Sequence, residues 1–284
     1  MFFPKVTILG VGLIGASFAL AMKKQGLCGH ITGFGRTEER LVRAKELGII
    51  DSFSLDPSIA CCESDLVLFS MPVGLIPSVA QRIKESLKKG ALVSDAGSIK
   101  GGIVHAIENV LADRASYVGA HPIAGSEQSG IDAASADLFE KRRCVVTPTD
   151  KTERAALSTV TGLWRLLGAE VVMMTPEEHD RVFGAVSHLP HIIAYEVMSC
   201  VNELDHSYLA YAGQGFLDST RIAASSPEVW RDICMGNREN LMKFLDTFVG
   251  RLEKVKGYLV SSDAESLLKE FNQAKMLRDD CGQR

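Results

Sequence analysis

The stretch VTILGVGLIGASFALAM, residues 6–22, decides the fold. It opens with an apolar run typical of a buried strand, turns at glycines spaced as G-x-G-x-x-G, and continues with the apolar pattern of a helix. Gly10 permits a tight turn, Gly12 lets the backbone approach a pyrophosphate, and Gly15 lets helix and strand pack closely. The helix N-terminus supplies N–H groups and the positive end of its dipole. The stretch therefore predicts the first βαβ unit of a dinucleotide-binding fold.

The same stretch carries no charge and follows Lys5, so a membrane span or a signal peptide is the alternative interpretation. It is short compared with the ~20 residues of a transmembrane helix, and its glycines are spaced for a turn. The net charge of −4 and the lack of a long Lys/Arg run indicate neither a nucleic-acid nor a membrane partner. Seven cysteines without a C-x-x-C pair favour a soluble protein of the reducing cytoplasm.

Strand-like and helix-like segments alternate from this unit to residue 174. Apolar strands separated by helices indicate a parallel sheet covered on both faces. From Pro176 onward the strand signals stop, and only long helical patterns remain. We therefore expect an α/β, Rossmann-type, doubly wound and mostly parallel sheet in residues 1–175 and an all-helical dimerisation domain in residues 176–284. The expected strands are residues 6–10, 30–34, 66–70, 91–95, 117–119, 143–147 and 170–174, and the expected helices are residues 13–25, 38–47, 76–88, 102–111, 154–167, 177–202, 207–224, 227–254 and 264–277.

The end of the second strand bears on the choice of cofactor. An acid about 20 residues after the glycines usually binds the ribose 2′-hydroxyl of NAD. Here the strand ends in GFGRTEER, residues 33–40, with no acid at Gly35 or Arg36. Arg36 and Thr37 could hold the 2′-phosphate of NADP, or Arg36 could stack on adenine or face solvent. NAD and NADP both stay open, with a lean toward NADP. We expect the cofactor to contact Gly10, Gly12, Leu13, Ile14, Gly15, Arg36, Thr37, Ser70 and Pro72.

Three further stretches carry residues suited to chemistry: SDAGSIK (94–100), GAHPIAGSEQSG (119–130) and VSHLPHIIAY (186–195). The first two follow neighbouring strands, so they share the sheet edge where such folds bind ligands. Pro122 keeps His121 out of the helical region and can hold its ring at a fixed angle. His121 is then a base of near-neutral pKa beside the cofactor, with Ser98 sharing its hydrogen bond. The alternative is a turn histidine that bonds only to backbone.

His188 and His191 are three residues apart and could bind a metal ion from one helix face. We expect no metal site, because neither H-E-x-x-H nor a supporting carboxylate pattern is present. Arg221 is a candidate clamp for a substrate carboxylate through its planar guanidinium. Its alternative role is a surface ion pair.

Six motifs together identify a resemblance that runs from about residue 5 to residue 252. The chain resembles the prephenate/arogenate dehydrogenase family of tyrosine biosynthesis. The His-Pro-Ile-Ala-Gly and Ser-His-Leu-Pro-His motifs in this order are specific, whereas G-x-G-x-x-G fits many unrelated enzymes. The motifs are ILGVGLIGAS, SDAGSIKGGIV, GAHPIAGSEQSGI, HDRVFGAVSHLPHIIA, GFLDSTRIAASSPEVWRDI and NRENL.

The resemblance implies oxidative decarboxylation of prephenate, a small dicarboxylate, to 4-hydroxyphenylpyruvate with NAD(P), in a homodimer. It implies that His121 takes the proton of the ring hydroxyl and that Ser98 hydrogen-bonds this hydroxyl and the nicotinamide. It also implies that Arg221 holds a substrate carboxylate, and that Ser187, His191 and Glu127 line the substrate pocket.

Alternatives remain within and outside this family. Arogenate differs from prephenate only by an amino group in place of a keto group, and no visible signature selects it. A β-hydroxyacid dehydrogenase would use a lysine base, for which we find no equally placed residue. A dinucleotide-binding redox sensor without catalysis is disfavoured by the set of Ser98, His121 and Arg221. We also expect a monofunctional enzyme, without a fused chorismate mutase or regulatory domain, in which any tyrosine inhibition acts at the active site.

Overall fold

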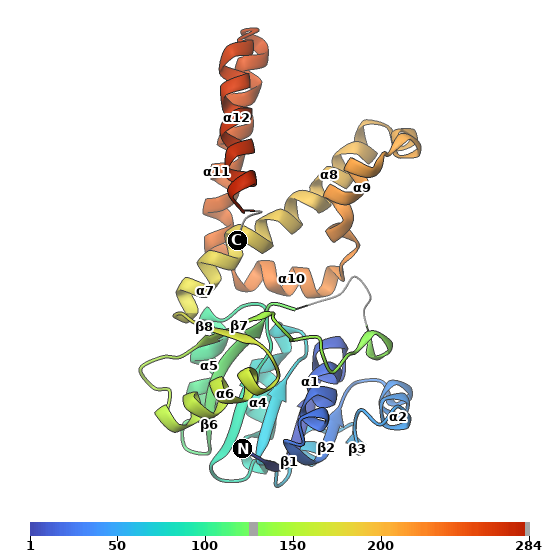
Figure 1. Cartoon of the computed structure of the whole chain (residues 1–284), viewed down its shortest axis with the longest axis vertical. Helices are drawn as coiled ribbons and strands as arrows, with labels where there is room; N and C mark the ends of the chain where they lie inside the picture. Colours follow the sequence, from blue (N-terminus) through green and yellow to red (C-terminus); the bar gives the residue numbers. More distant parts are fainter. Residues whose placement is uncertain (125–129, 282–284) are drawn as a thin grey trace. The chain divides into compact units, whose positions relative to one another are not determined.

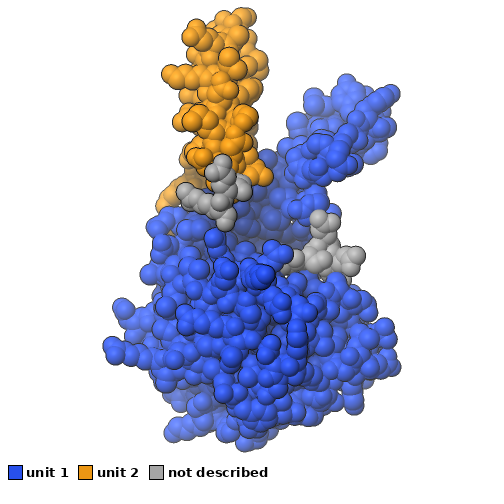
Figure 2. All heavy atoms as spheres, in the orientation of Figure 1, with its two compact units in different colours: residues 1–237 blue, residues 238–284 orange. Residues whose placement is uncertain are grey.

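The computed structural model describes residues 1–124 and 130–281. The chain divides into two compact units, residues 1–237 and residues 238–284 (Figure 2). The boundary predicted after residue 175 falls within the first unit, between its last strand and the helix that begins at Pro176. In the described part of the chain, no helix combines the length and the apolar character that a bilayer span requires.

The first unit is built on one eight-stranded sheet with the order β3-β2-β1-β4-β5-β6-β7-β8 (Figure 1). Neighbouring strands are parallel except β6 and β7, which are antiparallel. The order reverses at β1, which lies between β2 and β4, and such a switch point opens a crevice at the carboxyl ends of the strands. The strands are β1 (Phe3–Leu9), β2 (Cys28–Phe34), β3 (Ser52–Ser54), β4 (Leu66–Phe69), β5 (Ala91–Asp95), β6 (Ala115–Pro122), β7 (Arg143–Thr147) and β8 (Glu170–Met173).

Helices cover both faces of this sheet, and each face has its own core. One core joins Phe18, Phe139 and Trp164, whose rings meet edge to face with centroids 5.2–5.4 Å apart. The other core joins buried residues of β4 and β5 to those of α4 and α5. The doubly wound, mostly parallel sheet predicted from the sequence is thus confirmed. Its helices are α1 (Leu13–Lys24), α2 (Glu38–Glu46), α3 (Pro57–Cys61), α4 (Ile76–Ile83), α5 (Gly101–Leu111) and α6 (Arg154–Leu166).

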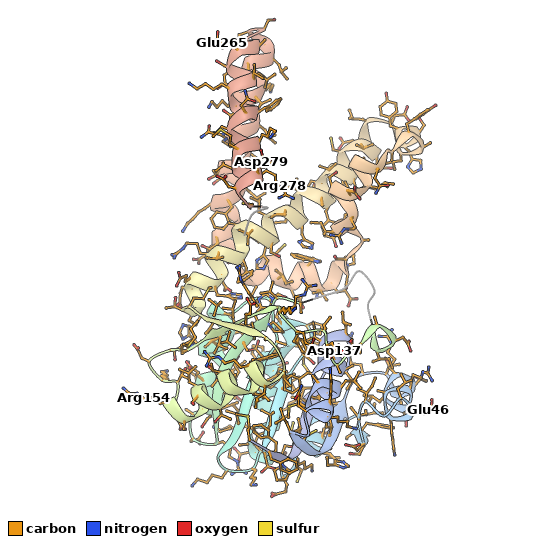
Figure 3. The ribbon with its side chains drawn as sticks, viewed as in Figure 1. Glu46, Asp137, Arg154, Glu265, Arg278 and Asp279 are labelled. Atoms are coloured by element: carbon orange, nitrogen blue, oxygen red, sulfur yellow. The ribbon has the colours of Figure 1, made fainter. Side chains whose placement is uncertain are left out.

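The segment after the undescribed residues returns to α1. The Ser135 N–H donates to Ser17 Oγ at 3.0 Å, and Asp137, labelled in Figure 3, forms an ion pair with Lys24 at the end of α1. The helix that opens at the glycine-rich turn is therefore held on its outer side by chain more than a hundred residues away.

Two details of the sheet differ from the sequence prediction. The short β3 and α3 were not expected, because three and five residues are too few to give a periodic signal. The strand predicted to end at residue 119 continues to Pro122, since β7 pairs with it and places His121 opposite Val145. His121 therefore lies within a strand and not in the loop after it.

The remainder of the first unit is helical. The helix predicted after Pro176 is present, with Pro176 in its first turn, and Thr175 caps it, with Oγ1 accepting the N–H of Glu178 at 3.1 Å. The helix expected over residues 177–202 contains a π-helical turn, a feature often found at functional sites. The elements are α7 (Pro176–Phe183), the π-helical turn (Gly184–His188), α8 (Leu189–Asp205), a 3₁₀ turn (His206–Tyr211), α9 (Gln214–Thr220), a second 3₁₀ turn (Arg221–Ala224) and α10 (Pro227–Gly236).

The single helix predicted over residues 227–254 is wrong, because the chain breaks at Asn237. The second unit begins after this break and consists of α11 (Arg238–Val260) and α12 (Ala264–Cys281). These two helices pack on each other, and Glu270 of α12 forms ion pairs with Arg251 and Lys254 of α11.

Candidate active site

The glycine-rich turn after β1 has a distinct constraint at each glycine. Gly10 has a φ of 105°, and a Cβ there would lie 2.5 Å from the carbonyl oxygen of Ser70. A Cβ on Gly15 would lie 2.3 Å from both the Gly10 carbonyl oxygen and Ser70 Oγ. Ser70 Oγ donates to that same carbonyl at 2.5 Å, which ties the end of β4 to the turn. Gly10 and Gly15 are therefore required by packing.

Gly12 is different, because a Cβ there would meet no atom within 4 Å. Gly12 precedes α1, and among the described residues no side chain caps this helix and no acid lies in its first turn. The exposed backbone and the positive helix end are suited to phosphate oxygens. The residues present thus fit the pyrophosphate of a dinucleotide.

A cavity of about 420 Å³ lies beside this turn. The predicted residues Gly10, Gly12, Arg36, Thr37, Ser70 and Pro72 all line it, whereas Leu13, Ile14 and Gly15 in α1 are not among its lining residues. The charged side chains among its described lining residues are all arginines: Arg36, Arg40 and Arg82. Such a cavity suits a ligand that carries phosphate.

His121 lies on the same sheet edge, near the end of β6. Its Nδ1 is 2.8 Å from Nε2 of His179 in α7, and its ring packs edge to face against Phe183. Burial lowers the pKa of His121 well below its usual value, and the positive charge of Lys100 adds to this effect. The imidazole is therefore neutral at neutral pH, as a base must be.

His179 continues the contact toward a carboxylate. Its Nδ1–H donates to Asp180 Oδ1 at 2.8 Å, and the Asp180 carboxylate also accepts the backbone N–H groups of Lys100 and Gly101, each at 2.7 Å. His179 is fully buried and Asp180 is 5% exposed. Neither residue was predicted from the sequence, although the motif HDRVFGAVSHLPHIIA contains both. Two consecutive polar residues in a helix carry no local signal of burial.

Ser98 lies in the loop between β5 and α5, half-buried. The ring of His188 hydrogen-bonds the Ser98 backbone and accepts the Asn237 Nδ2–H at 3.1 Å. Burial lowers the pKa of His188 to about 4, so this ring is neutral as well. Ser98 and His121 are therefore both held by residues of the helical part of the first unit.

A buried ion pair lies beneath this loop. Lys100 Nζ contacts Asp95 Oδ2, and both side chains are fully buried. Asp95 Oδ1 accepts the Tyr117 hydroxyl at 2.8 Å and the Ala120 N–H at 3.1 Å. The pair thereby joins β5 to β6 next to His121.

Ser187, His191 and Arg221 form a second group. The His191 Nδ1–H donates to the Ser187 carbonyl at 2.9 Å. Burial lowers the pKa of His191, the Ser187 bond opposes this, and Arg221 is near enough to lower the pKa further. Arg221 is exposed and lines a cavity of about 510 Å³ between α8 and α9. Trp230 stacks on His191 and also meets His188 edge to face, which links the two groups.

His188 and His191 have different hydrogen-bond partners, Asn237 and the Ser187 carbonyl. Within residues 1–124 and 130–281, no three His, Cys, Asp or Glu side chains gather as a metal ion would require. Glu127, predicted to line the substrate pocket, lies outside the described residues.

Comparisons with known proteins agree with this geometry. The nucleotide-binding domain of prephenate dehydrogenase matches residues 18–173, and its dimerization domain matches residues 175–273. A prephenate dehydrogenase of Bacillus subtilis (strain 168) is 36% identical over 281 residues, which are 96% of this chain and 75% of the relative. A cyclohexadienyl dehydrogenase of Zymomonas mobilis is 33% identical over 282 residues, which are 97% of this chain and 95% of the relative.

A solved structure extends the likeness to the backbone. The prephenate dehydrogenase of Aquifex aeolicus, crystallised with hydroxyphenyl propionate and NAD+, superposes with a TM-score of 0.92 at 36% identity and covers 99% of each chain. The resemblance found in the motifs is thus confirmed over nearly the whole chain. The protein is an oxidoreductase that belongs to the prephenate dehydrogenase family.

Proposed function

We propose that the protein converts prephenate and NAD(P) into 4-hydroxyphenylpyruvate, carbon dioxide and NAD(P)H. The observation that carries this proposal is His121, which is neutral, held at Nδ1, and on the sheet edge of the glycine-rich turn. One ring nitrogen is engaged by His179, so the other is available to a substrate hydroxyl.

In the proposed reaction, His121 takes the proton of the substrate hydroxyl while a hydride leaves the same carbon. A bound NAD(P) would supply the acceptor for this hydride. The resulting dienone loses its ring carboxylate as carbon dioxide and becomes aromatic, which drives the reaction. The protein mainly has to orient the substrate and hold the base.

We assign the other predicted residues by their surroundings. Ser98 lies on the loop that His188 holds, and it would hydrogen-bond the hydroxyl that reacts. Arg221 would hold a carboxylate, with His191 and Ser187 beside it. Glu127 keeps its predicted place in the pocket wall on the resemblance alone.

For the cofactor, we propose a preference for NADP over NAD. Arg36, Arg40 and Arg82 converge on the cavity beside the glycine-rich turn, where Thr37 adds a hydroxyl. Arg82 also lies 3.6 Å from Asp56, which offsets part of its charge. Guanidinium groups bind phosphate strongly, whereas an NAD site normally has an acid for the ribose. Comparing kcat/KM for the two cofactors tests this preference.

Arogenate is the second candidate substrate, because a cyclohexadienyl dehydrogenase is among the relatives. We further propose a homodimer formed through residues 176–284, in line with the matched dimerization domain. Exposed apolar side chains on α11 and α12 support it, among them Leu252, Leu259 and Phe271. Light scattering on the purified protein in solution should give twice the mass of one chain. The cytoplasmic location remains a prediction from the cysteine content.

The decisive experiment mixes the purified protein with prephenate or arogenate and with NAD or NADP, and follows the absorbance of the reduced cofactor. We expect turnover with prephenate. His121→Asn should lower kcat by about 10²–10⁴-fold and leave dinucleotide binding intact. No turnover with either substrate would contradict the proposed function, and unchanged turnover in the variant would remove His121 from the role of base.

A further inference from the structure

We infer that His179 and Asp180 are positioning residues for His121: they fix its tautomer so that Nε2 faces the substrate as the base, and they stabilise the imidazolium that forms. This inference rests on the proposed function, since it concerns the proton that His121 takes.

The Asp180 carboxylate sets the direction of the two hydrogen bonds that join His121 to His179 and His179 to Asp180. A carboxylate can only accept, so the proton between His179 and Asp180 is on His179 Nδ1. In a neutral His179 ring, Nε2 then carries a lone pair and must accept from its own partner. That partner is His121 Nδ1, at 2.8 Å, which must therefore be protonated. A neutral His121 is left with its lone pair on Nε2, the atom that can take a proton.

Asp180 is fixed in place on both of its oxygens. Oδ1 accepts the N–H of Lys100 and Oδ2 accepts the N–H of Gly101, at the N-terminus of α5, where the helix dipole stabilises a negative charge. Its own carbonyl accepts the Asn237 Nδ2–H at 2.7 Å. Ser98 lies two residues before Lys100. The Asp180 carboxylate therefore orients the base, His121, and also anchors the loop that carries Ser98, the residue predicted to hydrogen-bond the substrate hydroxyl.

The charges around His121 indicate that the Asp180 carboxylate stabilises its protonated form. Among the described residues, the titratable groups around His121 are His179 and Asp180 from α7, His188 from the π-helical turn, Cys144 from β7, and Lys100 with its partner Asp95. Tyr117 from β6 donates its hydroxyl to Asp95. The Lys100 charge is thus offset by Asp95, whereas the described partners of Asp180 are His179 and backbone N–H groups. A proton taken by His121 Nε2 creates a cation in a buried site, and Asp180 is the carboxylate connected to it through His179.

Three variants separate a role in proton uptake from a merely structural one. Asp180→Asn removes the charge at nearly constant shape, and His179→Gln keeps an acceptor for His121 but cannot carry a cation. Glu178→Gln removes an exposed carboxylate from the same helix and serves as the matched control. The measurements are kcat as a function of pH, and the dissociation constant of the dinucleotide as a check of folding.

We expect kcat of Asp180→Asn and His179→Gln to fall at least 10-fold, while dinucleotide binding stays unchanged. The rate falls on the acid side as His121 becomes protonated. Without the Asp180 carboxylate, or without the His179 ring that connects it to His121, the imidazolium of His121 is less stable. The pKa of His121 therefore decreases, and the acid limb of the kcat profile moves to lower pH. Glu178→Gln should move neither quantity. For Asp180→Asn and His179→Gln, a lower kcat without a shift of the acid limb, or an unchanged kcat, would overturn the inference.

A measurement on the unmodified protein does not depend on turnover. In ¹⁵N NMR of the histidine side chains, His121 should show a protonated Nδ1 and an unprotonated Nε2. A protonated Nε2 would sink the inference even if prephenate is turned over. The expected tautomer without turnover of prephenate would count against the proposed function and leave the arrangement of the three residues standing.

Discussion

The imidazole of His191 lies flat on the indole of Trp230, with ring centroids 3.5 Å apart and planes inclined by 20°. Trp230 belongs to α10 and His191 to α8, so the stacking sets the orientation of a predicted substrate residue from a separate helix. An aromatic pair of this kind contributes about 0.5–1.5 kcal/mol beyond the area it buries.

From this stacking we predict that Trp230→Ala lowers kcat/KM for prephenate by about 2- to 10-fold, because His191 loses its support. Trp230→Phe retains a ring and should lose less. The KM for the dinucleotide should stay the same in both variants. Steady-state kinetics with each substrate varied in turn measures these effects, and a loss confined to the KM of the dinucleotide would contradict the assignment.

The glycine-rich turn offers a matched pair of variants. Gly15→Ala should destabilise the fold by about 1–3 kcal/mol, because its Cβ would overlap the Gly10 carbonyl and Ser70 Oγ. Gly12→Ala should leave stability nearly unchanged, because its Cβ enters open space, yet it should weaken dinucleotide binding at least 10-fold by occupying the phosphate position. Thermal melting and dinucleotide titration separate the two effects. Equal melting temperatures for both variants would contradict this account.

The arginines at the cofactor cavity predict a selective effect. Arg36→Ala should lower kcat/KM for NADP by roughly 10- to 100-fold, since a charge-assisted hydrogen bond contributes about 1.5–3 kcal/mol. The value for NAD should change little, because NAD has no 2′-phosphate. Arg154→Ala, an exposed arginine at the start of α6, is a control that should change neither value. An equal loss with both cofactors would assign Arg36 to a contact shared by them.

Buried neutral histidines predict a loss of stability in acid. The pKa of His188 is lowered to about 4, so between its usual value of about 6.5 and pH 4 the unfolded chain binds more protons than the folded one. Stability is then greatest above pH 6.5 and declines as the pH falls toward 4. His188→Asn should lower the melting temperature at pH 7 through lost contacts, but it should reduce the further drop between pH 7 and pH 5. A drop as large as in the unmodified protein would assign the acid sensitivity to other groups.

The sequence by itself determined features that depend on neighbours along the chain. The spacing of Gly10, Gly12 and Gly15 predicted the tight turn between β1 and α1, and the structure has the positive φ at Gly10 and the open backbone at Gly12. Pro176 likewise marks the start of a helix, because proline fits the first helical turn. The alternation of strands and helices was enough to predict a parallel, doubly wound sheet. His121 and Ser98 were proposed because two consecutive strands bring their ends to one edge.

Only the tertiary structure decided what depends on distant partners. β6 extends to Pro122 because β7 pairs with it in antiparallel orientation. His121 is therefore part of the strand. The break at Asn237 places an amide that bonds to His188 and to the Asp180 carbonyl, 49 and 57 residues away. His179 and Asp180 meet His121 and the start of α5 across 58 to 80 residues. Such hydrogen bonds form only where the packing of distant elements brings donor and acceptor together. A pattern of neighbouring residues in the sequence therefore does not predict them.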